Sequence, residues 1–402
     1  MRTNSWRFYI TPFLDSGEYG TEVEVTKDVV FNSLGTIQLS FDNSDYDIGI
    51  LRNSNLSITM NNVLGAYSDV DVNESIFRYT RSNSKFRMTY RREENPNYAG
   101  MMVAGQTVLC TEVDVFVGLI DDNSAQTNLK DHLLPLSVLG YESLLDVAPV
   151  PTLANGDSVA TTLYKLLNQT TITDYLTVAL VNITPDEDQT IDDISPYEAS
   201  TAKEAISDLL LASNSVLYIK DLVVYVVPRT ATVAVQKTFY GQAALDGIEN
   251  IISIDSVRSG FAKVFNYLTW QDDPTIIVED GSSVSRYNIK AKEFAVGFFT
   301  NTTKIRTLLG AILDEFAIPK QEFVLATAVN YDTLALWFLD RVTVNYPLMV
   351  NGTCICGIAV CGEALLPTRL SNFYQDPPTD FKIIDIEINI KDSIIKFKLR
   401  KI

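Results

Sequence analysis

The chain has 402 residues, 46% of them hydrophobic and 20% charged, which is typical of a folded protein with two or three domains. Its 50 acidic and 32 basic residues give a formal net charge of −18, which disfavours tight binding to DNA or to an anionic membrane. No secretory signal opens the chain and no apolar run reaches the length of a membrane span, so we expect a protein made in a cytoplasm without a membrane anchor.

Strand patterns dominate the first third of the chain. Residues 23–25, 37–41 and 113–119 alternate apolar with polar side chains, which is the period of a strand with one buried face. Clusters of turn-forming residues, such as 42–45 and 61–62, lie between them. Short strands at this spacing predict a β-barrel or a β-sandwich.

The middle of the chain contains signals for two helices. Ser158 is placed to cap a helix whose apolar face consists of Val159, Leu163, Leu166 and Leu167. Thr201 and Glu204 form a capping box, in which each side chain satisfies one unpaired N–H of the first helical turn. Apolar residues at helical spacing follow the box, so a second helix begins there.

Two further segments belong to this middle region. Residues 215–228 predict a pair of strands that turns at Lys220 and Asp221. Residues 185–196 are acidic and bounded by prolines, which predicts a solvated loop.

The last third returns to strands and contains one clear helix. Asn301 or Thr302 caps this helix, Pro319 stops it, and its apolar residues recur at helical spacing between them. The chain then ends in a hairpin in which residues 384–390 and 395–399 both alternate strictly, with a turn after Lys391 and Asp392. Acidic residues of the first strand can face basic residues of the second.

The sequence contains no convincing catalytic or metal-binding motif. The single histidine, His132, lies beside apolar residues, and the chain has neither a nucleophile elbow nor a phosphate-binding glycine loop. The cysteines do not have zinc-site spacing, and buried thiols on a strand are the better interpretation of Cys110, Cys354, Cys356 and Cys361. We therefore predict no catalytic, cofactor-binding or metal-binding residues.

Two weaker patterns remain. Asp69 and Asp71 begin like a calcium loop, but Glu74 replaces the required glycine, so a polar turn is favoured over a weak cation site. Basic residues cluster in a stretch with interleaved aromatic residues, which is a nucleic-acid signal in a basic protein. In this acidic chain we expect the stretch to form a subunit contact instead; it comprises Arg78, Arg81, Lys85, Arg87, Arg91 and Arg92.

Several stretches together resemble the baseplate-hub family of phage tails, which includes the hubs of contractile tails and the amino-terminal part of siphophage tail-associated proteins. Segments 115–122 and 136–143 resemble the strand that closes the family's first barrel and the entry to its second domain. Segments 213–221 and 227–229 resemble the end of its α/β insertion. Segments 287–294 and 340–347 resemble its second barrel and helical insert, although Asn288 and Leu339 stand where the family leads us to expect glycine.

The resemblance implies a β-rich, α+β multidomain fold with two related antiparallel, tail-tube-like β-barrels. We place the barrels at residues 1–142 and 236–402, an α/β insertion domain at 143–235, and a helical insert near 301–317. The order of β-rich, α/β and β-rich regions agrees with this division.

The resemblance also implies a structural function without enzymatic activity. Three chains with two barrels each would form a homotrimeric ring that adapts a sixfold tail tube to a threefold spike, fibre or tape-measure end. The expected partners are other copies of the chain, the tail tube or distal tail protein, and the spike, fibre or tape-measure protein. Double-stranded DNA would pass without specific binding through an acidic or neutral conduit, and the location would be the virion after assembly in the host cytoplasm.

Two alternatives come from other classes of protein. A wall-degrading enzyme of the glycosidase type would show a deep cleft in which two carboxylates converge. A receptor-binding or adhesin module would show exposed aromatic pockets at one end and no duplicated barrel.

Overall fold

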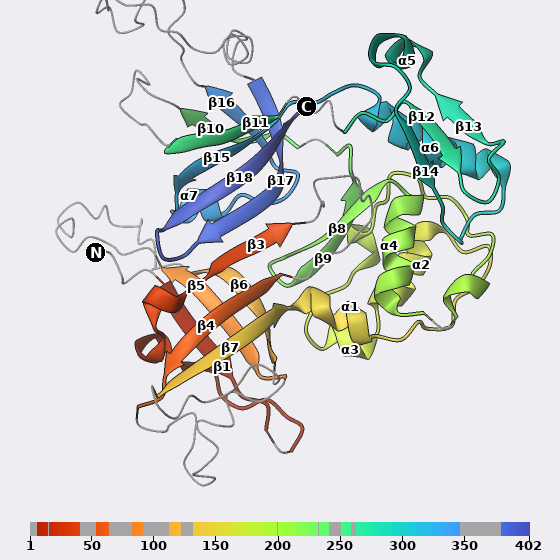
Figure 1. Cartoon of the computed structure of the whole chain (residues 1–402). Coiled ribbons are helices and arrows are strands. Elements are labelled where there is room, and N and C mark those ends of the chain that lie inside the picture. The colour runs from red at the N-terminus through yellow and green to blue at the C-terminus, as the bar shows by residue number, and fades with distance from the viewer. Residues whose placement is uncertain are drawn as a thin grey trace, which may run out of the picture.

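The computed structural model describes residues 6–14, 16–40, 54–63, 83–91, 112–121, 132–198, 200–231, 233–240, 251–258, 263–345 and 379–402. Two curled sheets lie one above the other, and the helical regions pack to one side of them (Figure 1). The first sheet is antiparallel throughout its described pairs. In spatial order its strands are β2 (Val23–Glu24), β1 (Trp6–Thr11), β5 (Lys85–Arg91), β6 (Glu112–Asp121), β7 (Leu133–Gly140) and β4 (Asn55–Asn61).

The second sheet contains the hairpin expected at the end of the chain. In spatial order its strands are β10 (Val235–Tyr240), β16 (Arg341–Asn345), β17 (Thr379–Asn389), β18 (Ile394–Lys401), β15 (Glu322–Ala328) and β11 (Ser253–Arg258). The short helix α7 (Tyr331–Leu334) follows β15 in the chain. Asp385 faces Lys398 and Glu387 faces Lys396, so the predicted pairing of acidic with basic residues is confirmed.

The two sheets are built on the same plan. In each, four strands that follow one another in the chain lie in the spatial order second, third, fourth, first: β5-β6-β7-β4 and β16-β17-β18-β15. An earlier strand flanks the second strand in both, although β1 runs antiparallel to β5 whereas β10 runs parallel to β16. Among the described residues each sheet runs from one edge strand to another, so we call them the first and second half-barrels. The predicted pair of related β-barrel units is confirmed in this form.

One strand crosses from the first half-barrel region to the second. β3 (Thr36–Ser40) pairs with residues 385–389 of β17, whereas β16 pairs with residues 379–382 of the same strand. The buried faces of both sheets contribute to one apolar core, which includes Phe8 and Ile37 from the start of the chain and Phe397 from its end. The two half-barrels are therefore joined both by backbone pairing and by a common core.

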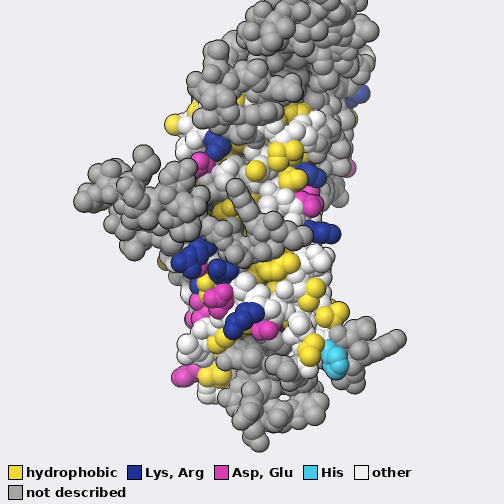
Figure 2. Space-filling model, turned by 90° about the vertical axis from the view of Figure 1, so that its left-hand side faces the viewer, with side chains coloured by type: hydrophobic (Ala, Val, Ile, Leu, Met, Phe, Trp, Pro, Cys, Tyr) yellow, Lys and Arg dark blue, Asp and Glu magenta, His cyan; other side chains and the backbone are white. Residues whose placement is uncertain are grey.

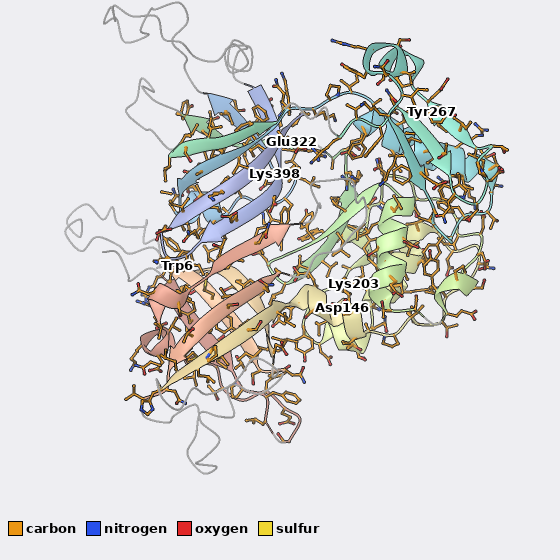
Figure 3. All side chains as sticks on the ribbon, in the orientation of Figure 1. Trp6, Asp146, Lys203, Tyr267, Glu322 and Lys398 are labelled. Carbon is orange, nitrogen blue, oxygen red and sulfur yellow. The ribbon has the colours of Figure 1, made fainter. Side chains whose placement is uncertain are left out.

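The middle region has the helices that the sequence predicts, together with a strand pair. Ser158 caps α2 and Thr201 caps α4, where the capping box with Glu204 is complete. The elements are α1 (Leu144–Val147), α2 (Val159–Leu167), α3 (Thr170–Thr173), α4 (Ala202–Ala212), β8 (Ser215–Lys220) and β9 (Val223–Pro228). Lys203 of α4 forms an ion pair of 2.8 Å with Asp146 of α1 (Figure 3).

The turn between β8 and β9 lies one residue later than expected. Lys220 pairs with Val223, so the two turn residues are Asp221 and Leu222, and both have positive φ angles, of 52° and 60°. A leucine in this conformation costs roughly 1–2 kcal/mol. Its side chain packs against the apolar core of the middle region, which offsets that cost.

The helical insert, which interrupts the second half-barrel in the chain, shares an apolar core with the middle region, and its Glu315 also contacts Lys382 and Arg400 of the second half-barrel. Its elements are β12 (Tyr267–Trp270), β13 (Ile277–Glu279), α5 (Gly281–Tyr287), β14 (Ala291–Phe294) and α6 (Thr302–Phe316). Asn301 caps α6, as the sequence predicts. One apolar core includes residues of α2, α4, β14 and α6, and the ring of Tyr197 stacks on Phe298 at 3.9 Å. The proposed boundaries at 142 and 235 stay a prediction.

The acidic loop 185–196 is less solvated than the sequence suggests. The carboxylate of Asp192 accepts hydrogen bonds of 3.0 Å from the N–H groups of Thr300 and Asn301 and pairs with the ammonium of Lys304. These contacts with the start of α6 lower the pKa of Asp192, against the opposing effect of its partial burial. The loop therefore attaches the helical insert to the middle region.

Both positions where the family resemblance leads us to expect glycine have positive φ angles, which glycine adopts most easily. Leu339 has a φ of 64°, and Asn288 has a φ of 61° with a ψ of 172°. The second combination lies in a region that residues other than glycine rarely occupy. The turn geometry is thus kept although the glycines are absent.

Candidate functional site

Of the residues considered for catalysis or metal binding, His132 lies in the part of the chain that the structure describes. His132 is exposed just before β7, with a φ of 52°, and its carbonyl oxygen accepts a hydrogen bond of 2.7 Å from the N–H of Asn62. Cys110, Cys354, Cys356 and Cys361 lie outside the described residues, as do Asp69 and Asp71. Within the described ranges, no group of three or more His, Cys, Asp or Glu side chains could hold a metal ion. The expected lack of a catalytic or metal site stays a prediction.

The polar face of the first half-barrel carries a network of ion pairs. Arg87 of β5 donates hydrogen bonds of 2.9 and 2.7 Å to Glu22 and one of 3.2 Å to Asp114 of β6. Its guanidinium also lies 4.4 Å from the centre of the Tyr9 ring, because Tyr9 faces it on β1. Burial and a hydrogen bond to Glu112 raise the pKa of Tyr9 to about 12.

These contacts of Arg87 lie within one chain, and the expected subunit contact of the basic stretch stays a prediction. Arg87 finds its acidic partners in its own chain: Asp114 lies on the neighbouring strand β6, and Glu22 lies just before β2, the strand on the far side of β1. Arg78, Arg81 and Arg92 lie outside the described residues. Figure 2 shows basic and acidic side chains side by side on this part of the surface.

Lys85 of the same strand forms a contact between the first half-barrel and the middle region. Its ammonium lies 4.0 Å from the ring centre of Tyr19 and 5.0 Å from that of Tyr175. The two hydroxyl groups are joined by a hydrogen bond of 2.7 Å, and burial lowers the pKa of Lys85. We call these three side chains the lysine clasp; its members are too far apart in the sequence for any local pattern to reveal it.

The polar face of the second half-barrel also carries paired charges. Lys396 of β18 forms an ion pair of 3.1 Å with Glu387 of β17. Lys398 of β18 lies 4.0 Å from Glu322 of β15, and Figure 3 shows both on neighbouring strands. On the described parts of both half-barrels, this face is therefore polar with charges of both signs, and its Glu322 end is buried.

A buried group of charges lies where the second half-barrel meets the helical insert and the end of β9. Glu315 of α6 has a side chain only 1% exposed, and it lies 3.3 Å from Arg229, 3.4 Å from Arg400 and 3.7 Å from Lys382. Glu322 accepts hydrogen bonds of 2.8 Å from Arg400 and 2.9 Å from Lys263. We call this set the junction charge cluster.

The cations of the cluster dominate the electrostatics of Glu315. Burial alone would raise the pKa of this carboxyl group, but Arg229, Lys382 and Arg400 together lower it to about 2. Burial lowers the pKa of Lys382 to about 8, and the neighbouring arginines act in the same direction. The cluster therefore binds three parts of the chain together through an ionised carboxylate.

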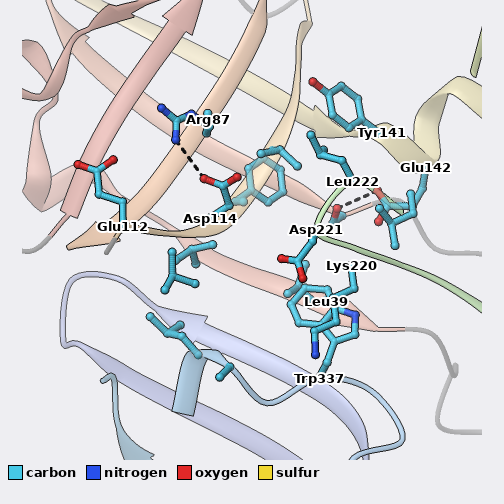
Figure 4. Close-up of a pocket in the computed structure, with 18 of the residues that line it drawn as sticks. Leu39, Arg87, Glu112, Asp114, Tyr141, Glu142, Lys220, Asp221, Leu222 and Trp337 are labelled. Atoms are coloured by element: carbon cyan, nitrogen blue, oxygen red, sulfur yellow. Dashed lines mark hydrogen bonds and ion pairs between the residues drawn. The ribbon is translucent and has the colours of Figure 1, made fainter. Parts of the chain in front are cut away.

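A groove of about 570 Å³ lies between the first half-barrel, the turn after β8 and the segment around α7 (Figure 4). One wall is the continuous run of residues 112–117 in β6. The opposite side includes Leu222 from the turn and Trp337 from the segment that follows α7. The sequence gives no signal for this groove, because its walls come from segments more than a hundred residues apart.

One carboxyl group of the groove differs from the others. Glu142 lies just after β7 and accepts a hydrogen bond of 3.0 Å from the hydroxyl of Ser54. Burial raises its pKa, while the hydrogen bonds and the distant charge of Lys203 oppose that effect. By contrast, Asp114 is paired with Arg87, and Glu112 accepts a hydrogen bond of 3.1 Å from Tyr9.

Comparisons with known proteins give a consistent result at the level of fold. No protein-family model matches the chain, and no curated protein matches its sequence. A tail protein from Neisseria meningitidis superposes with a TM-score of 0.56 at 11% identity, covering 99% of this chain and 96% of that one. A tail protein of the prophage MuSo2 from Shewanella oneidensis gives 0.55 at 11% identity, with 98% of each chain covered.

A third similar structure comes from a different bacterium. A prophage tail protein from Listeria monocytogenes gives a TM-score of 0.50 at 9% identity, covering 98% of this chain and 94% of that one. Identities this low establish the fold alone, but the likeness extends over nearly the whole length of each chain. The chain therefore has the fold of these three tail proteins, two of which come from prophages.

Proposed function

We propose that this chain is a structural subunit of a phage tail or of a phage-derived particle, and that it forms the hub of the tail tip or baseplate. The observation that carries the proposal is the pair of related half-barrels in one chain, within a fold shared with tail proteins over nearly its full length. Proteins with one fold can differ in function, so the proposal rests on the duplication as well as on the likeness.

The duplication supports a homotrimer. Three chains with two half-barrels each supply six similar units, so a threefold ring can match a sixfold tube on one side and a threefold spike, fibre or tape-measure end on the other. Strand edges support the same assembly, because an exposed sheet edge is a ready site for pairing with another chain. The tail tube or distal tail protein would be the partner on the sixfold side.

The charged faces support passage of DNA without binding. Paired charges of both signs, as on the described β5, β6, β17 and β18, offer phosphate no cluster of free cations. We propose that these polar faces line the conduit and that the chain is part of the virion, assembled in the host cytoplasm. Within the described ranges no helix is long and apolar enough to cross a membrane.

Native mass spectrometry of the purified chain over a range of concentrations tests the assembly. Because neighbouring tail proteins can drive association, the measurement includes a high-concentration sample and a chemically cross-linked one. A trimer at the highest concentrations supports the proposal. A stable dimer or tetramer contradicts it.

One observation, the groove, favours the alternative that the chain is a wall-degrading glycosidase. Glu142 has a raised pKa, as a general acid requires, and Asp221 also lines the groove. The engagement of Glu112 and Asp114 by Tyr9 and Arg87 speaks against it. Purified wild type and Glu142→Gln are compared on peptidoglycan: cleavage by the wild type that the variant loses would establish the enzyme, and no cleavage by either supports the structural role.

A further inference from the structure

The groove presents a strand edge that no described strand occupies. β6 pairs with β5 along residues 112–119, but it pairs with β7 only along residues 118–121. The side of residues 112–117 that faces away from β5 therefore has no partner strand among the described residues, and the same run forms a wall of the groove. An extended peptide can add to such an edge by main-chain hydrogen bonds.

A second observation points to a missing hydrogen-bond acceptor. The indole nitrogen of Trp337 is buried and has no hydrogen-bond partner among the described residues, although Trp337 lines the groove. Leaving a buried donor unpaired costs roughly 1–3 kcal/mol. A carbonyl oxygen of a bound peptide would satisfy it.

The charges of the groove determine which kind of peptide segment would bind there. Its described lining has four carboxylates and two cations, namely Glu112, Asp114, Glu142 and Asp221 with Arg87 and Lys220. Arg87 is already bound by Glu22 and Asp114, so a phosphate group has little to attract it here. A lysine or arginine side chain would instead find Glu112 and Asp221 on opposite walls (Figure 4).

We infer that this groove binds an extended segment of another protein, in which basic side chains alternate with small apolar ones. The apolar side chains would contact Val113, Val115 and Leu222, which line the groove beside the acidic residues. Charge favours a different protein over a second copy, because this chain has 50 acidic against 32 basic residues. The inference goes beyond the proposed function and does not depend on it, since the binding site lies within one chain.

The test uses two synthetic peptides, acetyl-Val-Lys-Val-Arg-Val-amide and acetyl-Val-Glu-Val-Glu-Val-amide, with the purified full chain. Binding is followed by isothermal titration calorimetry, and hydrogen–deuterium exchange reports protection of residues 112–117. We expect the basic peptide to bind and to protect this run, with affinity that falls as salt increases. We expect the acidic peptide not to bind.

Matched variants locate the binding. Glu112→Gln with Asp221→Asn should weaken binding of the basic peptide about fivefold, because two charge pairs are lost while hydrogen-bonding capacity is kept. Asparagine also tolerates the positive φ at position 221. Glu279→Gln with Asp314→Asn removes the same charge from exposed positions elsewhere and should leave binding unchanged. Trp337→Phe should weaken binding about as much as the first pair.

Four results would overturn the inference, three of which concern the peptides. Those three are equal binding of the two peptides, an equal loss of binding in both pairs of variants, and no binding up to millimolar peptide. Tighter binding of a double-stranded oligonucleotide than of the basic peptide, abolished by the groove variants, would also overturn it. Because the assay needs no ring, a failed trimer prediction and a failed groove prediction are distinguishable.

Discussion

We expect the junction charge cluster to contribute strongly to the stability of the protein. Glu315→Gln keeps the shape of the side chain but leaves Arg229, Lys382 and Arg400 without the carboxylate they surround. Removing one member of a buried ion pair typically costs 3–5 kcal/mol, because the remaining charge has no compensation and little water. The side chain of Glu315 is 1% exposed, so solvent screening does little to reduce this cost.

The pKa of Glu315 gives a second value for the contribution of its charge to the free energy of unfolding. A fall from the ordinary value of 4.5 to about 2 corresponds to about 3 kcal/mol, at about 1.4 kcal/mol for each tenfold change in the dissociation constant. Because the folded pKa is the lower one, this stability is present above pH 4.5 and is lost as the pH falls towards 2. The cost of breaking the buried ion pair and the value from the pKa agree, so we expect Glu315→Gln to lower the free energy of unfolding by about 3 kcal/mol at pH 6.

Urea unfolding of the wild type and the variant at pH 6 and at pH 3 measures both features. The difference between the two proteins should shrink at pH 3, because the wild type loses part of the contribution that the variant lacks at every pH. Asp314→Asn, a neighbouring exposed position on α6, is the control and should change stability little. A difference below about 1 kcal/mol at pH 6, or one that does not depend on pH, would show that the charge of Glu315 does not stabilise the junction.

Three further predictions concern single positions. Asn288→Gly should stabilise the protein by about 1 kcal/mol and Asn288→Ala should not, in thermal unfolding, because the backbone there suits glycine. Gly118→Ala should cost more than about 2 kcal/mol, since the added carbon would lie 2.1 Å from the carbonyl oxygen of Leu139, whereas Gly35→Ala meets no atom closer than 3.9 Å and should be mild. Glu142→Gln should raise stability at pH 7 and lose that advantage in acid, because burial raises the pKa of Glu142 and so disfavours its charged form in the folded state.

Local patterns predicted the elements of the fold well. The hairpin of β17 and β18 follows from strict alternation, which allows one face to be buried and forces acidic and basic residues to meet on the other. The caps at Ser158, Thr201 and Asn301 follow from hydrogen bonds within a few residues of the chain. Such interactions are decided by neighbours in the sequence, so the sequence reveals them.

The choice of long-range partners could not be predicted in the same way. Alternation at residues 37–41 indicates a strand with one buried face, but it does not say that β3 leaves the first half-barrel to pair with β17. The local sequence places Asp192 in a solvated loop, because the N–H groups it binds lie more than a hundred residues later. The lysine clasp and the groove depend on the same kind of distant contact.

The turn after β8 shows how packing can override a local preference. Aspartate tolerates positive φ, whereas leucine does not, so the local pattern favours a turn at Lys220 and Asp221. The pairing of β8 with β9 places the turn at Asp221 and Leu222 instead, and the apolar side chain of Leu222 is packed against the core. Leu339, which is 4% exposed, combines a positive φ with burial in the same way.

We propose that three copies of this chain form a ring of six similar half-barrels. A cryo-electron microscopy map of the assembled ring, prepared at high concentration or within the tail, tests it most directly. We predict threefold symmetry, six half-barrels around an axial opening, and the polar faces of β5, β6, β17 and β18 towards that opening. A twofold or fourfold assembly, or a threefold one whose axis does not pass between the half-barrels, would contradict the claim.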